Sequence, residues 1–146
     1  MNKEKKVMEF AQLDREFKQE SEAFKCAMKE GNLNEALTHL EKALMIERPL
    51  LKNLLEKLES MGVKVVNKDE AKATDDAFNR ALEGFYEAKK NYNEAIKNDS
   101  DEANGYLGDE IIHLMKALNI MNALVRKAQD KVNDSKEDSI KAIKRS

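Results

Sequence analysis

Residues 31–52 read GNLNEALTHLEKALMIERPLLK, and residues 105–126 read GYLGDEIIHLMKALNIMNALVR. The two stretches align without gaps and agree at these positions: Gly31/Gly105, Leu33/Leu107, His39/His113, Leu40/Leu114, Lys42/Lys116, Ala43/Ala117, Leu44/Leu118, Ile46/Ile120 and Leu50/Leu124. Shared composition alone rarely produces such a match, so we interpret the second stretch as a copy of the first. Apolar residues recur at three- and four-residue spacing, which predicts an amphipathic helix in each copy.

A stretch with regularly spaced aromatic residues precedes each copy. These residues stand seven apart in both stretches: Phe10, Phe17 and Phe24 in the first, and Phe78, Phe85 and Tyr92 in the second. A seven-residue repeat places side chains on one face of a helix, and we expect that face to belong to the core. Each copy is therefore predicted to be a long helical hairpin, in which an aromatic helix is followed by a leucine-rich one.

Glycine and asparagine residues mark the predicted helix boundaries. Gly31 and Gly62 are expected to end the first and second helices, because glycine is favoured just after a helix. Asn32 is expected to cap the second helix together with Glu35, and Asn67 to cap the third. The predicted helices cover residues 4–30, 33–61, 69–98 and 101–134.

Helices of about 40 Å each can pack side by side along their whole length. We therefore predict an all-α fold, an antiparallel four-helix bundle formed by a tandem duplication of a long helical hairpin. Residues 1–146 make one domain, with hairpin copies at about 4–61 and 69–134 and a charged C-terminal tail at about 135–146. Pro49 is expected either to kink the second helix or to divide it.

Composition and charge exclude several classes of partner. The 146 residues include 26 basic and 28 acidic ones. Because the two kinds are interspersed, we expect no large positively charged surface that could bind the backbone of a nucleic acid. The most apolar stretch, 111–125, is interrupted by His113 and Lys116 and is too polar for a membrane span. One cysteine cannot form an intrachain disulfide, and no apolar run follows the basic start, so we expect a cytoplasmic location.

The histidines raise the question of a metal site. Glu110 and His113 form a Glu-x-x-His motif, which carboxylate-bridged di-iron bundles carry on two of their helices. The first copy has Glu35 and His39 at a different spacing, so one of the two motifs is missing. We expect no metal and no other cofactor, with both histidines flanking the core. The alternative is a degenerate ferritin-like metal-binding bundle that uses these four residues.

Residues for catalysis are scarce. No Gly-Lys-Ser or Gly-Lys-Thr phosphate loop occurs, and the five glycines are scattered. Cys26 lies among apolar residues and is expected to be a small core hydrophobe rather than a reactive thiolate. We therefore expect that the protein is not an enzyme and has no catalytic residues.

Two groups of residues are candidates for contact with a protein partner. Tyr86 and Tyr106 fall outside the aromatic stripes, and tyrosine combines an apolar body with a polar tip that suits interfaces. The charged C-terminal region contains Val132, Ile140 and Ile143, which can fold against a partner.

Two families resemble parts of this sequence. Residues 31–44 resemble the second helix of a tetratricopeptide repeat, through Gly31, Asn32, Leu33, Glu35, Ala36, Leu40, Ala43 and Leu44. A larger part is similar to flagellar and secretion export chaperones of the hook-filament junction type, through Gly31-Asn32-Leu33, the leucine-rich run to Leu58, Asn104-Gly105-Tyr106-Leu107, Ile111, Ala117, Leu118 and Ile120. The second resemblance implies a holding chaperone or adaptor without catalysis.

The sequence thus favours a non-enzymatic helical protein-interaction module, an adaptor or export-chaperone-like protein. We expect it to bind a partner helix along a groove between its own helices or through its C-terminal tail. A structural homodimer is a further alternative, because leucine stripes can pair between chains as readily as within one. The partner, the face that it uses and the oligomeric state stay open at this point.

Overall fold

The computed structural model describes the backbone of residues 2–145 and the side chains of residues 10–134. It contains four helices: α1 (Asn2–Glu30), α2 (Leu33–Ser60), α3 (Lys68–Lys97) and α4 (Ala103–Arg145). No strand occurs among the described residues, so the all-α prediction is confirmed. The predicted boundaries agree closely except at the C-terminal end, where α4 continues to Arg145 instead of ending at residue 134.

Side-chain caps fix where α2 and α3 begin, as the sequence predicted. The side-chain oxygen of Asn32 accepts a hydrogen bond from the Glu35 backbone N–H at 3.2 Å, and that of Asn67 accepts one from Glu70 at 2.8 Å. Each bond satisfies a donor that the first turn of a helix leaves free. The two glycines that follow α1 and α2 adopt the left-handed backbone: Gly31 (φ +75°) and Gly62 (φ +72°).

Pro49 lies inside α2 without dividing it, because a single helix runs from Leu33 to Ser60. Proline has no N–H to donate to the carbonyl four residues earlier, which here belongs to Met45. Met45 is strongly exposed, so water can take the place of the missing donor. The division of this helix that we considered from the sequence is therefore wrong.

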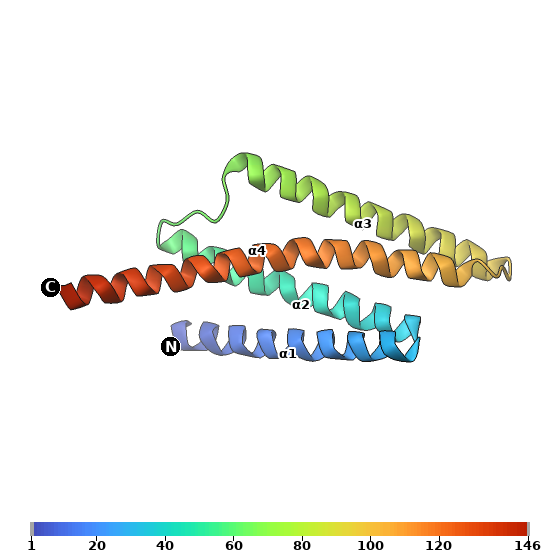
Figure 1. The fold of residues 1–146 in the computed structure, drawn as a ribbon, viewed down its shortest axis with the longest axis horizontal. Coiled ribbons are helices and arrows are strands. Elements are labelled where there is room, and N and C mark those ends of the chain that lie inside the picture. The colour runs from blue at the N-terminus through green and yellow to red at the C-terminus, as the bar shows by residue number, and fades with distance from the viewer. Residues whose placement is uncertain (1, 146) are drawn as a thin grey trace.

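The four helices pack as a bundle in the spatial order α1, α2, α4, α3 (Figure 1). The chain turns back after each helix, and α2 and α4 lie next to each other and run in the same direction (Figure 1). Within the described residues, no Cα atom of α1 comes within 8 Å of α3 or α4. The central pair α2 and α4 therefore holds the bundle together, and α1 and α3 lie on opposite sides of it.

Two apolar clusters form the core. The larger consists of Ala27, Ala36, Leu40, Ala43, Leu44, Phe85, Ile111, Leu114 and Leu118. The smaller consists of Leu54, Leu58, Val65, Ala128 and Val132. Of the two aromatic stripes only Phe85 is fully buried; Phe10, Phe17, Phe24 and Phe78 are half-buried at the edges of these clusters, and Tyr92 is half-buried outside them. Aromatic residues on α1 stay partly exposed because α1 packs on one neighbour alone.

Helix α4 carries more apolar side chains than its neighbours cover. Ile112 is 53% exposed and Met115 is 37% exposed, although both lie in the most apolar stretch of the sequence, 111–125. The reason is that α2 and α3 occupy only part of the circumference of α4. No helix among the described residues has an apolar stretch long enough to cross a membrane.

Candidate functional site

A groove lies between α3 and α4. It consists of two adjoining hollows of about 470 and about 490 Å³, which share Ala77 of α3 and Ile120 of α4. The first hollow is lined by Val66, Glu70, Ala73, Thr74, Ala77, Ile120, Ala123, Leu124 and Lys127. The second is lined by Ala77, Arg80, Ala81, His113, Lys116, Asn119 and Ile120.

Small side chains on α3 create this groove. Ala73, Ala77 and Ala81 stand four residues apart, which puts their methyl groups one above another on one helix face. Methyl groups are too short to fill the space to Ile120 and Leu124, and α3 diverges from α4 toward its own N-terminus (Figure 1). The alanine spacing was readable from the sequence, but only the divergence of the helices turns it into a groove.

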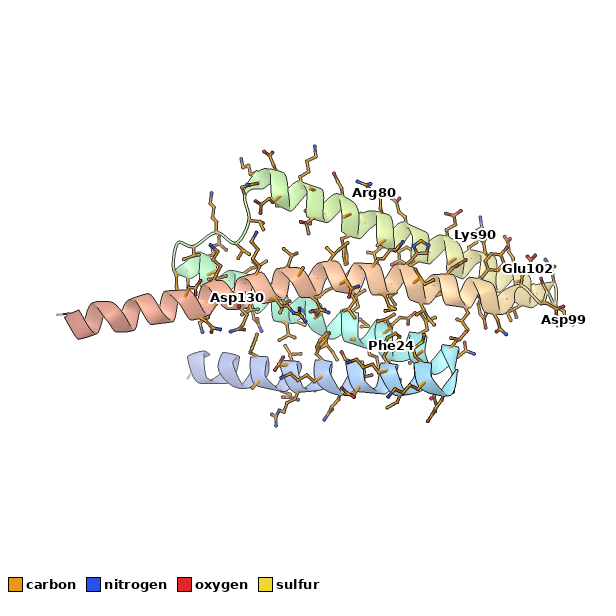
Figure 2. All side chains as sticks on the ribbon, in the orientation of Figure 1. Phe24, Arg80, Lys90, Asp99, Glu102 and Asp130 are labelled. Carbon is orange, nitrogen blue, oxygen red and sulfur yellow. The ribbon has the colours of Figure 1, made fainter. Side chains whose placement is uncertain are left out.

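Charged side chains lie at the edges of both hollows. In the first, Lys127 Nζ contacts Glu70 Oε2 at 3.1 Å and so links α4 to α3. Beside the second lie Arg80 of α3, which is labelled in Figure 2, and Lys116 of α4. Both are exposed, and neither forms an ion pair within residues 10–134. The groove therefore has a mostly apolar interior, with the Lys127–Glu70 ion pair at one end and, at the other, two basic side chains without ion-pair partners among the described residues.

His113 closes one end of the second hollow. Its ring packs directly on the backbone of α3 at Gly84, where a Cβ atom would lie 2.6 Å from His113 Nδ1. A glycine in the middle of a helix costs about 1 kcal/mol relative to alanine, but here it provides the space for the imidazole ring. The lone glycine in the middle of the third predicted helix was the sequence signal for this close approach.

His39, the equivalent histidine of the first copy, also contacts the outer helix of its own hairpin. Its Nδ1 lies 2.6 Å from Glu20 Oε2 of α1. Both histidines flank the core, as predicted, and both are half-buried. Among the described side chains no group of three or more His, Cys, Asp or Glu residues could hold a metal ion, so Glu35, His39, Glu110 and His113 do not form a ligand set.

Glu47 is a buried acid at the contact between α2 and α4, and the sequence analysis missed it. It is 1% exposed, and with its amide oriented to donate, Asn122 hydrogen-bonds both carboxylate oxygens. Loss of solvent raises the pKa of Glu47 to about 8, and the charge of Arg126 acts in the opposite direction. The sequence signal for its burial was its spacing, since Glu47 follows Leu44 by three residues and so lies on the same buried face of α2.

Glu110 is the second buried acid. Burial raises its pKa, the charge of Lys89 lowers it, and the charge of Glu41 raises it further. Its Oε2 atom has no hydrogen-bond partner among the described residues. A carboxyl group in this setting favours the neutral form. Neither Glu47 nor Glu110 lines the groove.

The proposed partner-binding residues fall in different places. Tyr86 is 61% exposed beside Phe85, and Tyr106 is half-buried, its hydroxyl 3.5 Å from Glu102. Val132 is only 2% exposed and belongs to the smaller core cluster, so this candidate for partner contact is a core residue instead. It is buried because it packs against Leu58 and Val65. Ile140 and Ile143 lie outside the residues whose side chains are described.

Cys26 also departs from its expected position, because its side chain is exposed rather than part of the core. Helix α1 is covered by α2 alone, so residues on its other faces meet solvent. A comparison with family models, with curated proteins and with solved structures finds no match for this chain.

Proposed function

We propose that this protein is a non-enzymatic interaction module that binds a helix of a partner protein in the groove between α3 and α4. The observation that carries this proposal is the groove itself, with its two adjoining hollows and mostly apolar walls. An amphipathic helix that lays its apolar face into a hydrophobic groove is a recurrent mode of peptide recognition.

The dimensions of the groove support a helical partner. Along α3 the lining residues extend from Glu70 to Ala81, which corresponds to about 17 Å of helix. A partner helix of about three turns has the same length and would meet Ala73 and Ala77, whose small side chains allow a close approach. The unpaired Arg80 and Lys116 then stand where acidic residues at the edge of the partner can reach them.

In this proposal the protein acts as an adaptor or as an export-chaperone-like holding protein in the cytoplasm. Holding a partner requires a surface but no reactive group. The two acids with raised pKa values, Glu47 and Glu110, are buried away from the groove, whereas catalytic groups with perturbed pKa values usually line the cleft where substrate binds. This separation favours binding over catalysis.

We also propose that the fold derives from tandem duplication of one antiparallel hairpin, although the two hairpins meet through a parallel pair, α2 and α4, rather than forming the fully antiparallel bundle expected from the sequence. Equivalent positions are buried alike in the two copies: Leu40 and Leu114, Ala43 and Ala117, and Leu44 and Leu118. His39 and His113 both contact the first helix of their own hairpins, His39 through Glu20 and His113 by packing on Gly84. The hairpins meet through their second helices, as two subunits of an ancestral twofold dimer would.

A pair of matched variants tests the groove. Ala73→Glu places a charge inside the first hollow, and Asn79→Glu places the same charge on an exposed position of α3 that lines neither hollow. We expect a protein captured from lysate by the wild type and by Asn79→Glu to bind Ala73→Glu about tenfold more weakly or worse. Equal capture by all three proteins would show that the partner uses another surface.

A further inference from the structure

The side of α4 that faces away from the core carries an apolar stripe, which we call the outer stripe. It consists of Gly105, Gly108, Ile112, Met115 and Asn119. The positions alternate between three- and four-residue spacing, which is the spacing of a coiled-coil seam. Ile112 and Met115 supply its exposed apolar area. Within one chain no described residue of another helix covers these two side chains fully.

The two glycines of the outer stripe have no function inside the chain. Neither adopts a positive φ, and a Cβ atom at either position would meet nothing within 4 Å. Gly108, in the interior of α4, destabilises the helix by about 1 kcal/mol relative to alanine. Gly84 differs in this respect, because the ring of His113 fills its space. The space above Gly105 and Gly108 is therefore open to something outside the chain.

We infer that a second copy of this chain covers the outer stripe, with the two α4 helices packed antiparallel across a twofold axis close to Ile112. The flanking charges identify the occupant. Asp109 and Lys116 stand seven residues apart on the same edge of the stripe, both are exposed, and neither has an ion-pair partner within residues 10–134. A twofold axis near Ile112 brings Asp109 of each copy level with Lys116 of the other.

Side-chain sizes are also self-complementary in this arrangement. Met115 of one copy comes level with the turn between Gly108 and Ile112 of the other, where the glycine leaves room for it. Asn119 comes level with the turn that begins at Gly105. A parallel pairing would instead place Asp109 beside Asp109 and Met115 beside Met115, which combines like charges with crowded apolar side chains.

The length of the outer stripe sets the strength of the dimer. From Gly105 to Asn119 it covers about 20 Å of helix, and an interface of this size lies at the low end for specific association. We expect a reversible dimer with a dissociation constant in the micromolar range. This self-association does not depend on the partner helix proposed above, although Lys116 and Asn119 also line the second hollow.

Charge reversal gives a test with an internal rescue. Asp109→Lys leaves two lysines on each stripe, and Lys116→Asp leaves two aspartates, so each variant alone should raise the dimer dissociation constant about tenfold. Mixing the two variants restores both opposite-charge pairs, and a heterodimer about as tight as the wild-type dimer should form. Lys90→Asp, on the exposed surface of α3, is the control and should dimerise like the wild type.

Sedimentation equilibrium of the full chain measures the four proteins and the mixture, and circular dichroism confirms that each variant remains folded. A wild-type protein that stays monomeric at about 100 µM would overturn the inference. So would two single variants that dimerise as tightly as the wild type, or a mixture that forms no heterodimer. In a parallel dimer the mixture would also pair opposite charges, but each single variant would only exchange one like-charge pair for another and would dimerise about as tightly as the wild type, so the single variants decide the orientation.

Discussion

The imidazole ring of His113 in α4 lies so close to Gly84 in α3 that a Cβ atom on residue 84 would be 2.6 Å from Nδ1. This contact holds the two helices together near the end of the second hollow, beyond which α3 diverges from α4 (Figure 1). The width of the groove therefore depends on a position where one helix has no side chain.

Gly84→Ala should destabilise the protein by about 1–2 kcal/mol. The added methyl group has to displace the ring of His113, and this cost exceeds the gain in helix propensity of about 1 kcal/mol. In a His113→Ala background the ring is absent, so the same substitution should stabilise the protein instead. Urea denaturation of the four proteins in this cycle measures both effects. If Gly84→Ala changed the stability in the same direction in both backgrounds, the ring of His113 would not clash with a methyl group on residue 84.

Glu47 should make stability fall as the pH rises from about 4.5 to about 8. Burial raises its pKa from 4.5 to about 8 in the folded protein, so the folded chain keeps a proton that the unfolded chain has released. The contribution of this group is therefore fully present below pH 4.5 and is lost as the pH approaches 8. Above that pH the contact between α2 and α4 has to accommodate a carboxylate.

Glu47→Gln should remove this part of the pH dependence. The amide stays neutral and can still hydrogen-bond Asn122, so at pH 8 the variant should be more stable than the wild type by on the order of a few kcal/mol. At pH 4.5 the two proteins should be about equally stable. Glu56→Gln, at an exposed position of α2, is the matched control and should show no such difference. If Glu47→Gln stabilised the protein equally at pH 4.5 and pH 8, the ionisation of Glu47 would not be the cause of the gain.

Asp99→Gly should stabilise the loop between α3 and α4. Asp99 is the one described residue other than glycine with a positive φ, of 52°, and a side chain in the left-handed region carries a steric cost. Glycine relieves it, and we expect a gain of about 0.5–1 kcal/mol in thermal or chemical denaturation. Asp101→Gly in the same loop starts from an ordinary backbone conformation and should give no gain.

Two truncations separate the core from the C-terminal end of α4. A chain that ends at Asp134 keeps Val132 in its cluster with Leu58 and Ala128 and is the reference for the comparison. A chain that ends at Lys131 loses this buried side chain and should be less stable by about 1–3 kcal/mol. If the shorter chain melts like the longer one, Val132 does not contribute to the core as its burial indicates.

Local chemistry made much of the fold predictable. Asn32 and Asn67 cap their helices through the predicted hydrogen bonds, and Gly31 and Gly62 provide the left-handed turns. These signals depend on neighbours within four residues, so they can be read without knowledge of the tertiary structure. The leucine stripes of α2 and α4 likewise mark the faces that become core.

The neighbours of each helix were not predictable in the same way. An amphipathic pattern defines which face is buried but not which helix covers it, and so the sequence did not reveal that α1 packs on α2 alone. Because α1 has a single neighbour, Cys26 is exposed to solvent. Glu47 was overlooked because a charge suggests a solvent-facing position, even though its spacing along α2 places it on the core stripe.

The dependence of α1 on a single neighbour has a consequence for native-state fluctuations. Among the described side chains of α1 only Ala27 is fully buried, so detaching this helix exposes far less apolar surface than separating α2 from α4. Hydrogen exchange in the native state should therefore reveal a subglobal opening in which the amides of α1 exchange together, ahead of those of the central pair. Such an opening would transiently uncover the face of α2 beneath α1 while the groove between α3 and α4 stays intact.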